Sequence, residues 1–230
     1  ATLSDAAKAN LLREAIVENS IFVTGNTVID SLFLSRKITK NVRQKGAPTG
    51  SFFLGESVKP IILTTLHRRE NLGKNLENIC EAIAHIAETE TVQFVIPVHK
   101  NPVVKKTIYG LLSNIAHIKL IQPASYEVFV ELMDASYFIL TDSGGIQEEA
   151  PSLGKPVLVV RDTSERPEAI ESGTVKLVGT DTENIVNEVR ILIHSREEYL
   201  KMSSAVNPYG DGTAATQIKE ILLNWYTNND

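Results

Sequence analysis

The segment with the clearest chemical potential is a glycine-containing loop at residues 142–149, which directly follows the apolar run 138–141. Ser143 can cap a helix that begins here, and Gly144 and Gly145 would let a ligand approach the first backbone N–H groups of that helix. Because a helix N-terminus carries about half an elementary positive charge, a phosphate is a natural ligand for such a loop. The alternative is an ordinary Ser-Gly-Gly turn that only starts a helix.

Glu149 extends this hypothesis from a phosphate to a nucleotide. It lies about one and a half turns into the expected helix. Its carboxylate oxygens can accept hydrogen bonds from two neighbouring hydroxyl groups, such as those of a ribose. A phosphate site followed by a ribose site is what a nucleotide requires.

A second loop, at residues 161–168, carries several charges directly after the apolar run 157–160. Arg166 could bind a phosphate or a sugar hydroxyl group, and Glu168 could orient it. Pro167 is expected to open the next helix, since proline is tolerated at the first helical position. The alternative is a solvated charged loop without a ligand.

Two histidines follow other apolar runs. His67 comes after the run 61–66 and is followed by two arginines, whereas His99 comes after the run 93–98. Because the charge of histidine changes near neutral pH, His67 could stabilise a departing phosphate. The alternative is that each histidine has only a structural role at a strand end.

These loops can meet only if the runs before them are neighbouring parallel strands. The runs are almost continuously apolar, which is typical of strands buried on both faces, and helical patterns lie between them. The alternation predicts an α/β fold with a doubly wound, Rossmann-like parallel sheet, in which ligands bind beyond the carboxyl ends of the strands. The predicted strands are 21–24, 61–66, 93–98, 118–121, 138–141, 157–160 and 175–178. The predicted helices are 4–18, 71–88, 101–113, 125–135, 145–153, 181–193 and 213–225.

Length and charge exclude several classes of protein. A chain of 230 residues can form one or two globular units, since domains typically contain about 150 residues. No run approaches the roughly 18 apolar residues of a membrane span, so we expect no membrane partner. The N-terminus shows no secretion leader, which favours a cytoplasmic location. A net charge of −5 argues against a nucleic-acid partner.

The remaining reactive or basic residues are interpreted as structural. Cys80, the single cysteine, lies on an apolar helical stripe and predicts a buried thiol. The histidine spacing matches no metal motif, and the glycine-rich motifs for dinucleotides and P-loops are absent, so we expect no metal and no cofactor. A basic run at residues 36–45 leads into a stretch rich in glycine and proline at 46–60, and we predict a solvated connection there.

Taken together, the loops resemble the non-hydrolysing UDP-N-acetylglucosamine 2-epimerases of bacteria and archaea. The motifs that carry the resemblance occur in the family's order and cover most of the chain. They are GNTVID at 25–30, HRREN at 67–71, PVH at 97–99, DSGGIQEEAP at 142–151, GKPV at 154–157, RDT at 161–163, ERPE at 165–168 and NPYGDG at 207–212. The family usually has a small residue before HRREN, where this chain has Leu66, which could crowd the ligand.

The resemblance implies that the chain is the C-terminal half of a GT-B-type two-domain fold. Residues 1–19 would be an interdomain helix, 20–206 a UDP-binding Rossmann-like domain and 207–230 a C-terminal crossing helix. The family's N-terminal domain, with the carboxylates expected to move the C2 proton, would then lie outside this chain and be its partner. A homodimer is a further possible assembly.

The resemblance also implies a reaction and a set of site residues. The family interconverts UDP-N-acetylglucosamine (UDP-GlcNAc) and UDP-N-acetylmannosamine (UDP-ManNAc) by elimination of UDP to a 2-acetamidoglucal and re-addition. The alternatives are a non-catalytic UDP-sugar-binding module and a lobe of a GT-B glycosyltransferase. The implied contacts are His67 with phosphate, Ser143, Gly144 and Gly145 with the diphosphate, Glu149 with ribose, Arg166 with phosphate and sugar, and Phe129 with uracil. Arg68 and His99 match positions associated with a second, regulatory UDP-sugar in some members.

Overall fold

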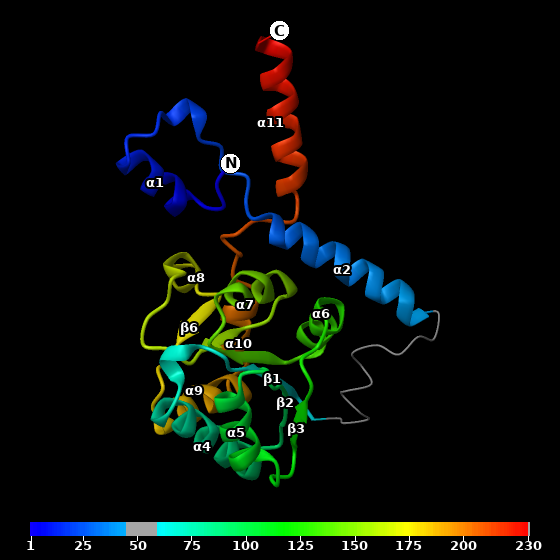
Figure 1. Ribbon diagram of the computed structural model, residues 1–230, viewed down its shortest axis with the longest axis vertical. Coiled ribbons are helices and arrows are strands. Elements are labelled where there is room, and N and C mark those ends of the chain that lie inside the picture. Colours follow the sequence, from blue (N-terminus) through cyan, green and yellow to red (C-terminus); the bar gives the residue numbers. More distant parts are fainter. Residues whose placement is uncertain (45–58, 230) are drawn as a thin grey trace.

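The computed structural model describes residues 1–44 and 59–229, and at the centre of this part of the chain lies a parallel sheet (Figure 1). The sheet has six strands in the order β3-β2-β1-β4-β5-β6, and every neighbouring pair is parallel. From β1, the strands β2 and β3 extend the sheet in one direction, and β4, β5 and β6 extend it in the other. Doubly wound sheets bind ligands where this direction changes, which is here between β1 and β4. The strands are β1 (Ile61–Thr65), β2 (Gln93–Pro97), β3 (Ile118–Ile121), β4 (Phe138–Thr141), β5 (Val157–Val159) and β6 (Val175–Leu177). The predicted doubly wound α/β fold is confirmed.

Helices cover both faces of the sheet, and each face has its own apolar core. Figure 1 shows α4, α5 and α9 on one side of the sheet and α6, α7 and α8 on the other. Because successive side chains of a strand point to opposite faces, Leu140 of β4 packs into the first core and Ile139 into the second. The helices of the first face are α4 (Lys74–Thr89), α5 (Pro102–Leu112) and α9 (Thr182–His194). Those of the second are α2 (Thr27–Gln44), α6 (Tyr126–Ala135), α7 (Gly144–Glu149) and α8 (Pro167–Glu171).

Most of the predicted helices are confirmed, with ends displaced by a few residues. Asp181 caps α9 by accepting the backbone N–H of Asn184 at 2.9 Å, and Pro167 is the first residue of α8. Cys80 of α4 is fully buried in the core of the first face, as predicted. The predicted first helix is shorter than expected, since α1 (Asp5–Arg13) ends five residues before residue 18. Helix α10 (Arg196–Ser203) was not predicted.

Two predictions about the region before the sheet are wrong. Among the residues that the structure describes, the apolar run 21–24 joins no strand of the sheet; it follows a short 3-10 helix, η1 (Glu18–Ser20), and its bridge pairs Thr2 with Val23. Phe22 and Val23 lie outside the core with about two-fifths of their surfaces exposed. The basic run was predicted to be a solvated connection, but up to residue 44 it is part of helix α2. Within it, Arg36 forms an ion pair with Asp134 at 2.8 Å. The rest of the predicted loop, up to residue 58, lies outside the described residues.

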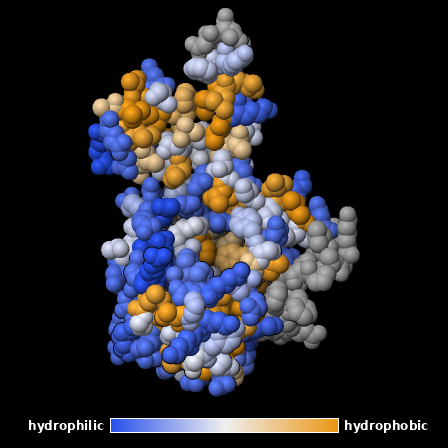
Figure 2. Space-filling model, in the orientation of Figure 1, coloured by the Kyte–Doolittle hydropathy of each residue, from blue (hydrophilic) through white to orange (hydrophobic). Residues whose placement is uncertain are grey.

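Two helices, α1 and α11 (Ala214–Asn229), project from one end of the sheet and its covering helices, and we call this pair the helical extension (Figure 1). The base of α11 is tied to α2, because the backbone N–H of Ala215 donates to Asp30 Oδ1 at 3.0 Å. Figure 2 shows apolar surface gathered over the helical extension, whereas the remaining surface in that view is mostly hydrophilic. None of the helices in the described ranges is long and apolar enough to cross a membrane.

Candidate functional site

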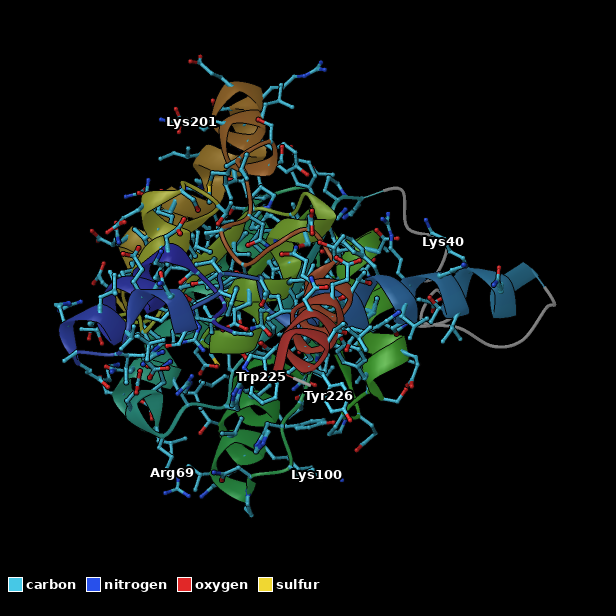
Figure 3. All side chains as sticks on the ribbon, turned by 90° about the horizontal axis from the view of Figure 1, so that it is seen from above. Lys40, Arg69, Lys100, Lys201, Trp225 and Tyr226 are labelled. Carbon is cyan, nitrogen blue, oxygen red and sulfur yellow. The ribbon has the colours of Figure 1, made fainter. Side chains whose placement is uncertain are left out.

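The carboxyl ends of β1 and β4 bring the two most informative loops together. The strands pair in register with Thr65 opposite Thr141, and their hydroxyl oxygens are 2.6 Å apart. His67 therefore lies next to Asp142 although 75 residues separate them in the chain. Figure 3 shows Arg69 and Lys100, which follow β1 and β2, extending from the same side of the molecule. The sequence prediction that these loops share one edge is confirmed.

Asp142 joins the loop that follows β4 to the loop that follows β1. Its side chain is completely buried, and its Oδ2 accepts the backbone N–H groups of His67 and Arg68 at 2.9 Å each and Asn71 Nδ2 at 3.2 Å. Its backbone carbonyl also accepts Arg68 Nε at 3.2 Å. No role was predicted for Asp142, although an ionisable residue at the end of a buried strand was a signal for one.

His67 lies half-buried above this carboxylate. Its Nδ1 is 3.2 Å from Asp142 Oδ1, and its ring stacks on the ring of His99 with 5.6 Å between centroids. Burial is the largest effect on the imidazole and lowers the pKa of His67 below its usual value. Asp142 opposes this shift, while His99 and Arg68 add to it. A ligand anion beside the ring would counter the lowering effects and favour the protonated imidazole.

A pocket of about 190 Å3 opens beside His67. Phe129 of α6 and Ile146 of α7 line it together with His67, His99 and two prolines, one the last residue of β2 and the other from the loop after β3. Leu66 also borders this pocket but is only 1% exposed, because its side chain belongs to the core of the first face. Whether Leu66 crowds a ligand stays a prediction, since it borders the pocket with little of its surface exposed.

The start of α7 differs from the prediction in one respect. Ser143 occupies the N-cap position, but its side chain makes no capping hydrogen bond, so the predicted cap is wrong. Instead, Thr141 Oγ1 accepts the backbone N–H of Ser143 at 2.9 Å. Gly144 is buried under Arg68, since a Cβ atom at this position would lie 3.2 Å from Arg68 Nη2. Gly145 is exposed, so the backbone at the start of the helix is accessible there.

Arg68 belongs to a network of charges over this helix. Its Nη2 is 3.4 Å from Glu165 Oε2, and Glu165 Oε1 is 3.3 Å from Nη2 of the buried Arg161. Arg161 also donates to Glu70 at 2.5 Å. Arg68 thus lies over the glycine loop, and its backbone N–H and its Nε both donate hydrogen bonds to Asp142.

Glu149 has a hydrogen-bond partner that was not predicted. Tyr126, the first residue of α6, donates its hydroxyl to Glu149 Oε2 at 2.7 Å. Burial raises the pKa of the Glu149 carboxyl, although the tyrosine hydrogen bond opposes this effect. The other carboxylate oxygen, Oε1, faces Gly145, since a Cβ atom added to that glycine would lie 3.8 Å from it.

Arg166 is oriented by Glu148 rather than by Glu168. Its Nε donates to Glu148 Oε1 at 2.5 Å, and Asn26 donates to the other oxygen of this nearly buried carboxylate at 2.8 Å. Glu168 is engaged elsewhere, since it accepts the hydroxyl groups of Ser4 at 2.9 Å and Tyr209 at 3.3 Å. Within the described ranges, no group of three His, Cys, Asp or Glu side chains is arranged to hold a metal ion.

The strand order and the loops at one edge define the class of this protein: a Rossmann-like α/β domain of the type found in GT-B proteins. Comparison with known proteins then gives the family. The family model described as UDP-N-acetylglucosamine 2-epimerase matches residues 1–223, and the chain belongs to this family.

Three relatives illustrate how far the similarity extends. The chain is 48% identical over 223 residues to a UDP-N-acetylglucosamine 2-epimerase of Escherichia coli K12, a match that covers 96% of this chain and 59% of the relative. The crystal structure of the Neisseria meningitidis UDP-GlcNAc 2-epimerase bound to UDP-GlcNAc has a TM-score of 0.90 at 48% identity, covering 97% of this chain and 60% of that one. The Methanocaldococcus jannaschii enzyme in complex with UDP-GlcNAc and UDP has a TM-score of 0.79 at 36% identity, with coverages of 97% and 60%. The chain thus spans about three-fifths of the length of its relatives.

Proposed function

We propose that this chain is the nucleotide-binding lobe of a UDP-GlcNAc 2-epimerase and that UDP binds along the edge formed by β1, β4 and α7. The uracil ring packs against Phe129, the ribose hydroxyls bind Glu149, and the diphosphate lies over the start of α7. The residues that contact the diphosphate and sugar phosphate are Ser143, Gly144, Gly145, Arg166 and His67.

The observation that carries this proposal is the link between α6 and α7. Tyr126 and Phe129 are three residues apart on α6 and therefore lie on the same side of that helix. Because Tyr126 is bonded to Glu149, the aromatic ring of Phe129 and this carboxylate border one surface. A nucleoside needs this combination, with an apolar wall for the base and an acceptor for the ribose hydroxyls. The relatives solved with UDP-GlcNAc and UDP support the choice of ligand.

The proposed reaction is the interconversion of UDP-GlcNAc and UDP-ManNAc by elimination and re-addition of UDP. His67 assists the departure of UDP by contacting the phosphate on which negative charge develops. The carboxylates near this edge are engaged: Glu149 by Tyr126, Glu148 by Arg166 and Glu168 by Ser4 and Tyr209. The proton at C2 is therefore moved by groups in the part of the relatives' length that this chain does not span.

Isothermal titration calorimetry of Glu149→Ala with UDP and with pyrophosphate tests the ribose assignment. Loss of hydrogen bonds to a charged group typically costs about 1.5–3 kcal/mol, so we expect UDP to bind roughly 10- to 100-fold more weakly. Pyrophosphate, which has no ribose, should bind with unchanged affinity. Glu183→Ala is the matched control, since Glu183 lies exposed on α9 at the opposite face of the sheet. Equal losses for both ligands would show that Glu149 does not bind the ribose.

The division of labour is tested by solvent deuterium incorporation at C2 of UDP-GlcNAc, followed by NMR. We expect no exchange with this chain alone, and measurable exchange when it is mixed with the part of the Escherichia coli relative that it does not span. His67→Ala should reduce the exchange in the mixture by about 100-fold or more, as expected for loss of a positioned proton donor. Rapid exchange by the chain alone would contradict this proposal, whereas UDP binding without exchange in the mixture would favour a binding module.

A further inference from the structure

We infer that Asp142 is a positioning residue for His67: it holds the imidazole proton on Nδ1 and thereby directs Nε2 to the ligand. This inference rests on the proposed function only for the identity of the ligand, a diphosphate. Asp142 itself is completely buried, so it acts on a ligand only through His67.

The first argument is the set of groups around the carboxylate. The backbone N–H groups of His67 and Arg68 and the amide of Asn71 all donate to it. Because these three N–H groups can act only as hydrogen-bond donors, Asp142 is the acceptor in each of these hydrogen bonds. The remaining contact, between Asp142 Oδ1 and His67 Nδ1 at 3.2 Å, is then favourable only if Nδ1 carries a hydrogen.

The second argument is the rigidity of the arrangement. The two backbone hydrogen bonds fix the turn that carries His67, and Thr65 and Thr141 join the strands immediately before it. The ring of His99 stacks on one face of the imidazole. With its backbone, its Nδ1 and one ring face all held, the imidazole keeps Nε2 on the edge away from Asp142.

The consequence is that a phosphate oxygen can accept a hydrogen bond from Nε2 only when His67 is protonated. Neutral His67 with hydrogen on Nδ1 has a lone pair on Nε2, which repels an anion. Binding of the diphosphate therefore takes up a proton at His67. The charged and titratable groups that shift the pKa of His67, and so control this protonation, are Asp142 after β4, His99 after β2 and the adjacent Arg68.

The direction of the pH dependence follows from these groups. Affinity for UDP is highest where His67 is protonated and decreases as the pH rises through its pKa. Asp142 favours the protonated ring, so Asp142→Asn lowers the pKa of His67 and moves the decrease to lower pH. A neighbouring opposite charge typically shifts a pKa by about one to three units, which is the expected displacement of the pH midpoint. His99→Gln removes a neighbour that disfavours the charge and should move the midpoint upward.

Two measurements test the inference. Proton–nitrogen correlation spectra of 15N-histidine-labelled protein, with His67→Ala to assign the signal, should show hydrogen on Nδ1 of neutral His67. Calorimetric titrations of UDP across pH 5–8, with Asp142→Asn and His99→Gln compared to the unmodified chain, should show the opposite displacements described above. Hydrogen on Nε2 in the neutral ring would overturn the inference, as would an Asp142→Asn variant that loses affinity equally at every pH.

The first measurement needs neither a folded Asp142→Asn variant nor a bound ligand. If UDP fails to bind but His67 carries its hydrogen on Nδ1, the proposed function is wrong and the positioning of His67 is confirmed. If UDP binds but the hydrogen is on Nε2, the positioning of His67 is wrong and the proposed UDP binding is supported.

Discussion

Two leucines in different regions of this chain have very different surroundings. Leu140 of β4 is completely buried between the sheet and the helices of its first face, whereas Leu223 of α11 is 55% exposed. The contrast extends to whole regions, because the central strands β1 and β4 are buried along their full length. In the helical extension, Trp225 and Tyr226 are 66% and 64% exposed; Figure 3 shows both on α11.

The difference shows that the apolar side chains of the central strands are buried within the described chain, whereas many of those in the helical extension are exposed. A helix with an apolar stripe normally buries it against another element, since burial contributes about 25 cal/mol per Å2 of apolar surface. A hollow of about 620 Å3 between Phe22 and the apolar residues Ile221, Leu222 and Trp225 is the place where another surface could pack. We predict that this region governs association, while the sheet governs the stability of the fold.

Substitution of Leu140 by alanine should give the largest effect on stability. Leu→Ala changes in a core remove packing and leave a cavity, which typically lowers the free energy of unfolding by about 2–5 kcal/mol. Chemical denaturation followed by circular dichroism measures this change. A loss below about 0.5 kcal/mol, the range of surface substitutions, would show that the sheet is not the stabilising region.

Removal of the Asp181 cap should give an intermediate effect. Asp181→Ala leaves the N–H of Asn184 without its acceptor, and such substitutions typically cost about 1 kcal/mol. Asp181→Asn is the matched control, because asparagine caps helices about as well as aspartate. The same denaturation experiment should therefore separate the two variants, and equal losses would show that the hydrogen bond does not stabilise α9.

Polar substitution in the helical extension should have the smallest effect on folding. Leu222→Ser and Leu223→Ser change exposed positions and should alter the free energy of unfolding by no more than about 0.5 kcal/mol. Sedimentation velocity over a range of concentrations should nevertheless show reduced self-association, because an exposed apolar patch is removed. Undiminished self-association, or a loss of stability comparable to that of Leu140→Ala, would contradict the comparison.

Much of the candidate site could be predicted because it depends on local pattern and on one topological rule. Apolar runs that precede polar loops indicate strands, and parallel strands bring their following loops to one edge. This reasoning places His67, Gly144 and Glu149 at a common edge, where the structure has them. It fails at residues 21–24, since an apolar run outside the sheet has the same local pattern as a buried strand.

What the sequence could not supply is the partner of each side chain. Ser143 has the right residue type and position for a cap, yet Thr141 takes its backbone N–H and no capping bond forms. Arg166 is held by Glu148 instead of its nearer neighbour in the motif, Glu168.

The sequence by itself determined the alternation of strands and helices, and with it the edge at which a ligand can bind. Strands and helices are predicted from the composition and the hydrophobic period of a short segment, and both can be read from that segment alone. Only the tertiary structure decided that Asp142 lies under His67 and that Tyr126 holds Glu149. These pairs lie 75 and 23 residues apart in the chain, and a hydrogen bond forms or fails over a few tenths of an ångström. Strand register and helix packing set distances on that scale, and both arise only when the whole sheet is assembled.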